Sequence, residues 1–217
     1  MRKGELTRER IIAAAAPIFN QHGYEGTSIH ALMEATGLEK GGIYRHFSNK
    51  EELAAEAFRF SLNQIRKIRT DDLEQISGSL ARLHYVIERF TETPSPIAGG
   101  CPLMNAAIDC DDGNPLIRDL AAQGLRQWRN RIAKIAEDGI AAGEISSTAD
   151  PRRIANVIIS ALEGALMLAR MERTRTPLCD VRVTLSDWLD SLGASKTKPT
   201  TPRVREKKRA VRAHPTT

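Results

Sequence analysis

Apolar residues recur along most of this chain at steps of three and four, the spacing that places side chains on one face of an α-helix. The alternation of apolar and polar residues that is typical of strands is hard to find anywhere. The first periodic segment includes Ile11 and Ala15, and we expect its helix to have Thr7 as N-cap and to continue to about His22. Gly23 follows as the predicted end. The pattern therefore predicts an all-α fold.

Two short helices are predicted next. One begins near Thr27 and ends at Gly37, and the other covers residues 39–46, with Ile43 facing the interior. The turn of about three residues between them contains a glycine, which is the helix-turn-helix arrangement.

Capping, proline and glycine signals mark the remaining helix boundaries. Residues 48–51 fit a capping box, in which the Ser48 side chain accepts from the Glu51 amide and the Glu51 carboxylate reaches back. A long helix to about residue 69 is expected to follow. The later helices are predicted over residues 73–92, 102–110, 115–142, 151–173 and 180–192, about nine helices in all.

The N-terminus carries charges where a signal peptide needs apolar residues. The most apolar segment, residues 154–169, is interrupted by polar residues and falls short of the roughly 20 that a spanning helix requires. Three cysteines with no close pair argue against a disulfide framework. We therefore expect a soluble, cytoplasmic protein without a membrane partner.

The formal net charge of +5 is unevenly distributed. Residues 194–217 hold eight Lys and Arg against one Glu, a net +7, and they lack large apolar side chains, so we expect a disordered basic tail. The rest of the chain sums to −2, although residues 1–50 carry +2. Only the two ends of the chain are therefore candidates for contact with a polyanion.

Side chains able to bond phosphate gather on or just after the second helix of the predicted pair. Gly41 and Gly42 stand near the start of that helix, where missing side chains would let backbone approach a DNA duplex. Because two glycines inside a helix cost on the order of 1 kcal/mol each, a specific need for clearance is indicated. The donors are Lys40, Tyr44, Arg45, His46 and Lys50.

The segments Thr27–Ser28–Ile29, Ala35–Thr36–Gly37–Leu38 and Lys40 to Leu53 resemble the DNA-binding domain of the TetR family of transcriptional regulators, over roughly residues 5–65. The resemblance implies a two-fold dimer with an N-terminal three-helix reader, a fourth helix acting as a lever and a helical C-terminal domain that binds an effector. It also implies roles for single positions. The implied phosphate contacts are Thr27 and Ser28, the base-edge and close-approach positions are Lys40, Gly41 and Gly42, the backbone clamps are Tyr44, His46 and Lys50, and the variable specificity position is Arg45.

Three residues depart from the family pattern. Glu39 stands where many members have serine, and its carboxylate could accept from a cytosine amino group or repel phosphate. Gly42 replaces a frequent threonine, and Met33 replaces a small alanine, which would widen the crossing of the two helices. The operator sequence therefore does not follow from the resemblance.

Several features have a plain structural alternative beside the functional one. The simplest interpretation of four residues is that they belong to the core, but they could also line an effector cavity among helices four to eight. These residues are Cys101, Met104, Trp128 and Met167. Residues 99–105 are expected either to form a loop that leads into a helix or to line that pocket. Cys101 and Cys110 lack the spacing of a zinc site and are expected to be buried thiols, so no metal and no cofactor is predicted.

Small and apolar residues over 154–169 and 181–192 predict a dimer face, although both helices could instead close the monomer core. The predicted organisation is a helix-turn-helix domain over 1–50, an effector-binding and dimerisation domain over 51–193, and the tail over 194–217. The leading function is a homodimeric repressor released from double-stranded operator DNA by a small molecule. Its rivals are an enzyme, for which no catalytic constellation is present, and a nonspecific DNA-binding protein driven by the tail.

Overall fold

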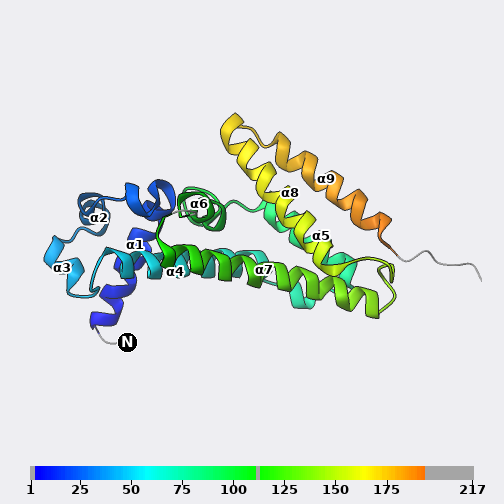
Figure 1. Cartoon of the computed structure of the whole chain (residues 1–217), viewed down its shortest axis with the longest axis horizontal. Helices are drawn as coiled ribbons and strands as arrows, with labels where there is room; N and C mark the ends of the chain where they lie inside the picture. The colour runs from blue at the N-terminus through cyan, green and yellow to red at the C-terminus, as the bar shows by residue number, and fades with distance from the viewer. Residues whose placement is uncertain (1–2, 111–112, 194–217) are drawn as a thin grey trace, which may run out of the picture.

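The structure, a computed structural model, describes residues 3–110 and 113–193. The described residues form an elongated bundle with the N-terminus near one end and the end of α9 near the other (Figure 1). The predicted tail, 194–217, lies outside the described residues. The α-helices are α1 (Lys3–Gly26), α2 (Ile29–Thr36), α3 (Lys40–Tyr44), α4 (Lys50–Thr70), α5 (Ser79–Glu92), α6 (Pro102–Asp109), α7 (Pro115–Ala141), α8 (Pro151–Glu172) and α9 (Thr176–Ser191).

The all-α prediction is confirmed. In the described part of the chain the only β-type pairing is an isolated bridge between Ile145 and Gly193. Figure 1 shows α1 to α3 at one end, α4 and α7 running from that end into the body, and α8 beside α9 along the far side. The chain therefore has a small N-terminal head joined to a larger helical body by two long helices.

Buried apolar side chains form three clusters that follow this division. The head is built around Ile11, Leu32 and Ile43. The body has its own larger cluster from α5, α7, α8 and α9, which includes Ile87 and Leu162. A third cluster from α4, α6 and α7 lies between them. Because this junction is itself packed, movement in the body can be transmitted to the head.

The first helix differs from its prediction at both ends. It begins at Lys3, before the predicted N-cap Thr7, and it ends at Gly26. Gly23 is the predicted stop, and it does leave helical geometry, with φ of 72° and ψ of 175°. The segment after Gly23 resumes helical geometry, so the glycine produces a kink in α1 and does not end the helix.

The cap of α4 lies one residue beyond the predicted position. Asn49 is the N-cap, and its side chain accepts from the Glu52 amide at 2.8 Å. The Glu52 carboxylate accepts from the Ser48 amide at 2.7 Å. Glu51, the predicted partner of Ser48, instead accepts from the Asn114 side chain at 2.6 Å. The prediction for Ser48 and Glu51 is therefore wrong, because a contact from α7 occupies Glu51.

Two further boundaries also differ. The helix predicted over 73–92 is divided into a short 3-10 turn, Leu73–Gln75, and α5, which begins at Ser79. The last helix begins at Thr176, one turn before its predicted start at 180, because Pro177 fits the first turn of a helix.

Helix α8 has 22 residues, and by length and composition alone it could cross a membrane, since an 18-residue window within it has a mean hydropathy of 1.5. The expectation that this segment is too short is therefore wrong. Its Ile154, Ile158 and Leu162 are buried in the core of the body, the usual reason for an apolar helix in a globular protein.

Candidate functional site

The helix pair α2 and α3 is held by two buried anchors and a tight turn. Leu32 from α2 and Ile43 from α3 are fully buried in the core of the head. Between them the chain turns at Gly37, whose φ of 65° lies in the left-handed region that glycine adopts without strain. Met33 packs partly buried against the same core, so its larger side chain is accommodated at this crossing.

Helix α3 and the residue that caps it carry two exposed basic side chains, Lys40 and Arg45. The helix is a single turn, Lys40–Tyr44, shorter than the predicted 39–46, so His46 lies after its end. Lys40 and Arg45 are exposed, whereas Tyr44 and His46 are partly buried. With Ile43 fixed inside, the other side of α3 faces solvent.

Gly41 is not required by the packing of the free protein. A Cβ atom built on Gly41 would meet nothing within 4 Å, and one on Gly42 would make only ordinary contact with the Leu38 side chain, at 3.4 Å. Neither glycine has the positive φ that excludes other residues. The two glycines therefore have no explanation inside the head, which is consistent with a need for clearance against an outside partner.

Two further predicted contacts lie at helix starts. Ser28 is the N-cap of α2, and its hydroxyl oxygen accepts from the Ala31 amide at 3.1 Å. Lys50 is the first residue of α4, and its ammonium lies 4.5 Å from the centre of the Tyr24 ring, a cation–π arrangement. Helix α2 and the start of α4 lie at the same end of the molecule as α3 (Figure 1).

Thr27 differs from its predicted role as a phosphate contact. Its residue is only 1% exposed, and its hydroxyl donates to the Gly23 carbonyl at 2.6 Å. The side chain therefore closes the kink in α1, and its hydroxyl is not exposed at the surface.

The head is joined to the body by a cluster of amide hydrogen bonds. The Asn105 side chain on α6 donates to the Asn20 carbonyl at 2.9 Å and to the Gly99 carbonyl at 2.9 Å. The Asn20 side chain donates to the Ala98 carbonyl at 2.8 Å. Gly99 is needed here, because a Cβ atom would lie 2.9 Å from the Asn20 carbonyl oxygen. We call Asn20, Asn105 and residues 98–100 the amide junction.

Beside this junction the body contains a cavity of about 670 Å³. Cys101 and Trp128 line it, as predicted for the effector pocket, whereas Met104 and Met167 are not among its lining residues. Met167 is 47% exposed on the outer side of α8, because helical rotation turns it away from the body core. The apolar wall of the cavity comes from α4 to α7 and includes Leu62, Ile65, Val86, Phe90, Leu103 and Trp128.

Ionisable groups near the cavity are strongly affected by burial. Burial raises the pKa of the Cys101 thiol to about 12, and the Glu163 carboxyl next to it adds to that shift. The pKa of Cys110 is raised to about 11, again mainly by burial. Both cysteines are therefore protonated, unreactive thiols near neutral pH, as expected for buried cysteines. In the described part of the chain, no group of three His, Cys, Asp or Glu side chains could hold a metal ion.

The outer side of α8 carries a row of exposed apolar side chains. Val157, Leu168 and Met171 are exposed along it, and Gly164 leaves open space in the same row. Ala155 and Ala165, two of the small residues predicted for a dimer face, are buried instead in the monomer. Of the predicted dimer face on α8, only the exposed side chains on the outer side of the helix are therefore available to pack against another chain.

Comparison with known proteins places these features in a family. Residues 11–57 match the family model for "Bacterial regulatory proteins, tetR family", and residues 79–185 match the model for "Tetracyclin repressor-like, C-terminal domain". A crystal structure of a TetR transcriptional regulator from Chloroflexus aurantiacus J-10-FL has a TM-score of 0.84 and 42% identity, covering 89% of this chain and 98% of that one. The chain belongs to the TetR family.

Two other TetR-type proteins are similar to this regulator. The HTH-type transcriptional repressor DhaR of Mycobacterium sp. strain GP1 is 23% identical over 172 residues, 79% of this chain and 86% of DhaR. The TetR family regulator CifR, solved as a cysteine mutant with 26-bp double-strand operator DNA, has a TM-score of 0.73 and 22% identity over 82% of this chain and 94% of that one. The second likeness shows the fold alone.

Some groups in this TetR-family protein are not found by reading the sequence. The amide junction joins residues 78 to 85 positions apart, and no local pattern marks Asn20 or Asn105 as partners. Three cavity arginines, Arg66, Arg69 and Arg131, also look like ordinary surface residues of α4 and α7. Their only signal in the sequence is the three-residue spacing of Arg66 and Arg69, which puts both on one helix face.

Proposed function

We propose that this TetR-family protein is a homodimeric repressor that binds operator DNA through α3 and is released by a small molecule held in the 670 Å³ cavity. The observation that carries the proposal is the outward face of α3, where Lys40 and Arg45 flank a glycine that the head itself does not need. Such a face can approach a major groove closely while its donors reach bases and phosphates. The structure of CifR in complex with operator DNA supports the same mode.

The DNA contacts of the proposal follow from position. Lys40, Gly41, Gly42 and Arg45 would lie along the base edges. The remaining donors would clamp the sugar-phosphate backbone at either end of α3, and these are Ser28, Tyr44, His46 and Lys50. Thr27 is left out, because its hydroxyl is bonded inside the head.

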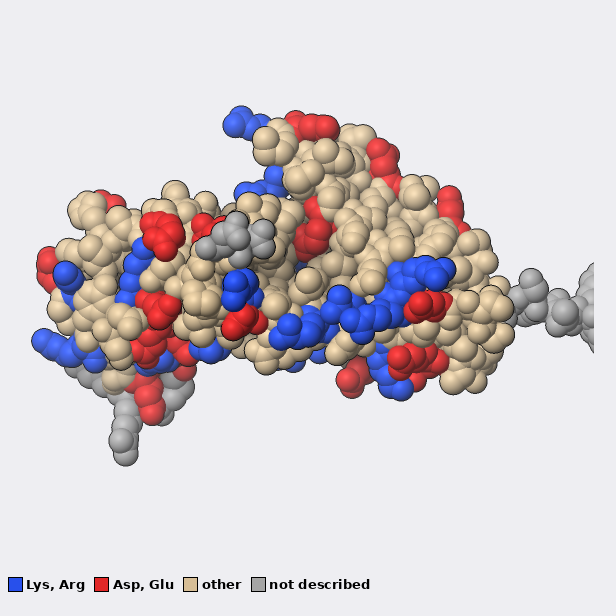
Figure 2. Space-filling model, in the orientation of Figure 1, with Lys and Arg blue, Asp and Glu red and all other residues tan. Residues whose placement is uncertain are grey.

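Dimer formation in the proposal uses the exposed apolar row on α8, extended by Val183 on α9. A two-fold pair would place the two α3 helices about one DNA turn apart, roughly 34 to 36 Å, as two successive major grooves require. The effector would release the operator if it bound more tightly to a dimer with a different spacing. Positively and negatively charged side chains are mixed over the head (Figure 2). This distribution agrees with DNA binding through specific contacts and not through a uniformly basic surface.

The relatives in this family are transcriptional regulators. We therefore propose that this protein is also cytoplasmic and has no enzymatic activity. The domains of the proposal are the reader over 1–50, continuing into α4, and the effector-binding and dimerisation body over 51–193.

A footprint on the DNA upstream of the protein's own gene tests this function. We expect a protected near-palindrome, and a titration by fluorescence anisotropy should show at least about tenfold weaker binding for Lys40→Ala or Lys50→Ala. The Lys50→Ala loss should also reduce the salt dependence by about one phosphate contact, whereas the Lys40→Ala loss should relax the preference for the operator sequence. Lys134→Ala is the matched control, since this exposed lysine on α7 bonds only Asp138 in the described structure. Uniform coating of unrelated DNA would refute the proposal.

A further inference from the structure

The cavity of the body has one sign of charge on its walls. Arg66 and Arg69 reach it from α4 and Arg131 reaches it from α7, whereas no Asp or Glu lines it. Across the described residues, no carboxylate oxygen lies within 4.0 Å of any of these three guanidinium groups. Figure 2 shows a stripe of Lys and Arg side chains along the face where α7 lies, with several Asp and Glu side chains beside it on the outer surface.

Glu163, on α8, is an acidic residue that acts electrostatically on Arg69. Burial lowers the pKa of Arg69, and the negative charge of Glu163 offsets this shift only in part. Burial also raises the pKa of Glu163 itself, whose two carboxylate oxygens are buried beside the Cys101 thiol. Glu163 therefore compensates Arg69 incompletely, and a charged Arg69 carries a desolvation cost that an added anion would reduce.

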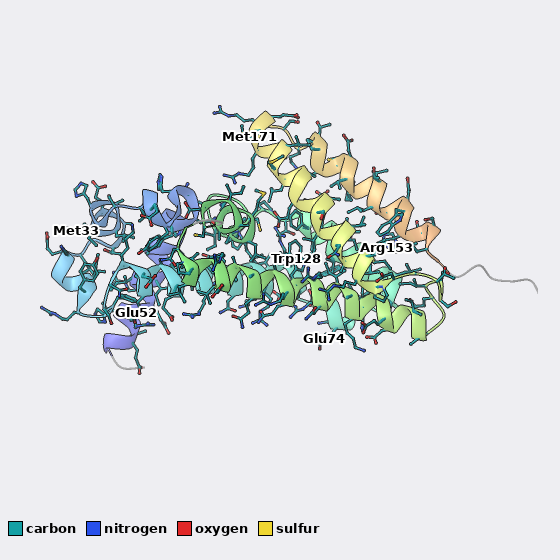
Figure 3. All side chains as sticks on the ribbon, in the orientation of Figure 1. Met33, Glu52, Glu74, Trp128, Arg153 and Met171 are labelled. Carbon is teal, nitrogen blue, oxygen red and sulfur yellow. The ribbon has the colours of Figure 1, made fainter. Side chains whose placement is uncertain are left out.

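The rest of the cavity wall is largely apolar and includes two aromatic side chains. The Phe90 and Trp128 rings are stacked, with centroids 5.9 Å apart and planes inclined by 5°. The Arg69 guanidinium carbon lies 3.7 Å from the Phe90 ring centre, so charged and aromatic surfaces meet at one place. Trp128 projects from α7 toward the interior of the body (Figure 3). A volume of about 670 Å³ is within the range of sites that enclose small organic molecules.

We infer that the effector of this regulator is an organic anion, a carboxylate, sulfonate or phosphate on an aromatic or aliphatic body, whose charged group is bound by Arg66, Arg69 and Arg131. The inference rests on the proposed effector role of the cavity and adds the chemical class of its ligand. A guanidinium group bonds such an oxyanion with two parallel N–H donors, and Phe90 and Trp128 enclose the apolar part. A cationic ligand would meet three like charges with no carboxylate on the wall to balance it.

Two probes with the same aromatic body separate charge from apolar binding. One is 8-anilinonaphthalene-1-sulfonate, and the other is its uncharged counterpart N-phenyl-1-naphthylamine. Binding is followed by probe fluorescence excited through tryptophan, since Trp128 lines the cavity. We expect Arg69→Gln to weaken sulfonate binding by about tenfold or more and to change binding of the neutral probe by less than about twofold.

The controls keep the result specific. Arg126→Gln alters an exposed arginine of α7 that does not line the cavity, and it should leave both probes unchanged. Arg131→Gln repeats the test from the other wall, in case Arg69→Gln lowers the melting temperature. Equal loss of both probes in both variants, or no binding of the sulfonate to the wild-type protein, would overturn the inference.

Operator binding without any probe is measured on the same variants. It should be unchanged in Arg69→Gln, because the arginine is in the body. If the wild-type protein failed to bind operator, the proposed function would fall. Selective loss of the sulfonate would still identify the cavity as an anion site, so the two failures are distinguishable.

Discussion

Replacing Gly41 by alanine separates the stability of the head from its approach to DNA. The new Cβ atom would meet nothing within 4 Å in the free protein. Alanine favours a helix by up to about 1 kcal/mol relative to glycine. The variant should therefore be as stable as the wild type or more so, by at most about 1 kcal/mol in the free energy of unfolding. For a chain of this size, that corresponds to a rise in melting temperature of about 2 to 4 °C.

Operator binding should change in the opposite direction. If the glycine allows backbone to approach a base pair, one methyl group there forces the helix outward and weakens its donor contacts. Loss of a single good contact costs about 1 to 3 kcal/mol, or roughly fivefold to more than a hundredfold in Kd. Gly42→Ala is the neighbouring comparison, since its Cβ would touch Leu38 at an ordinary 3.4 Å.

The assay combines thermal unfolding by circular dichroism with fluorescence anisotropy on a labelled operator duplex. A more stable Gly41→Ala protein with unchanged operator Kd would refute the clearance argument. A destabilised protein would show instead that the space around Gly41 is not open, and the packing argument would then be wrong.

Four other outcomes are expected. Asn49→Ala removes the cap of α4 and should lower the free energy of unfolding by about 1 kcal/mol in urea titrations, whereas no change would refute the cap. The Glu52 carboxylate accepts from the Ser48 amide, which lowers its pKa, so its stabilising effect is present above its ordinary pKa and lost as pH falls through the lower folded value. Glu52→Gln should remove that part of the acid sensitivity, and an identical pH profile of stability would contradict it. Leu168→Arg, at a position 46% exposed on α8, should give a folded monomer by light scattering, whereas a persistent dimer would exclude this face. Asn105→Ala leaves carbonyl groups of the amide junction unpaired and should cost about 1 to 3 kcal/mol in the same urea titrations, with an unchanged midpoint as the contrary result.

Sequence reading succeeds where a local pattern is sufficient. Helical periodicity predicted the all-α fold, and Pro102, Pro115 and Pro151 each begin a helix at the predicted residue. Proline suits this place because its missing amide would have no partner in the first turn. Family membership was likewise predicted from motif residues between 27 and 53, and the comparisons confirm it.

The errors arise where two local solutions are almost equal and a distant contact decides between them. Ser48 with Glu51 and Asn49 with Glu52 both satisfy the capping pattern, and Asn114 selects the second by bonding Glu51. Sequence cannot supply that choice, because Asn114 lies 63 positions from Glu51.

The candidate pocket shows the same limit. Trp128 and Cys101 line the cavity, but Met167, chosen for its flexible apolar side chain, lies on the opposite side of α8 from the core. The composition of a helix tells which residues are apolar. Its rotation against neighbouring helices decides which of them face a cavity, and that rotation depends on packing of the whole body.

The amide junction has a thermodynamic consequence for the regulator. Leu103 and Asn105 are two residues apart on α6, one against the cavity and the other bonded to α1. A ligand that displaces Leu103 therefore acts on the hydrogen bonds that position the head. Such coupling is reciprocal, so operator DNA must weaken ligand binding by the same factor as the ligand weakens operator binding. A cell containing many operator copies would then need more ligand to obtain the same response.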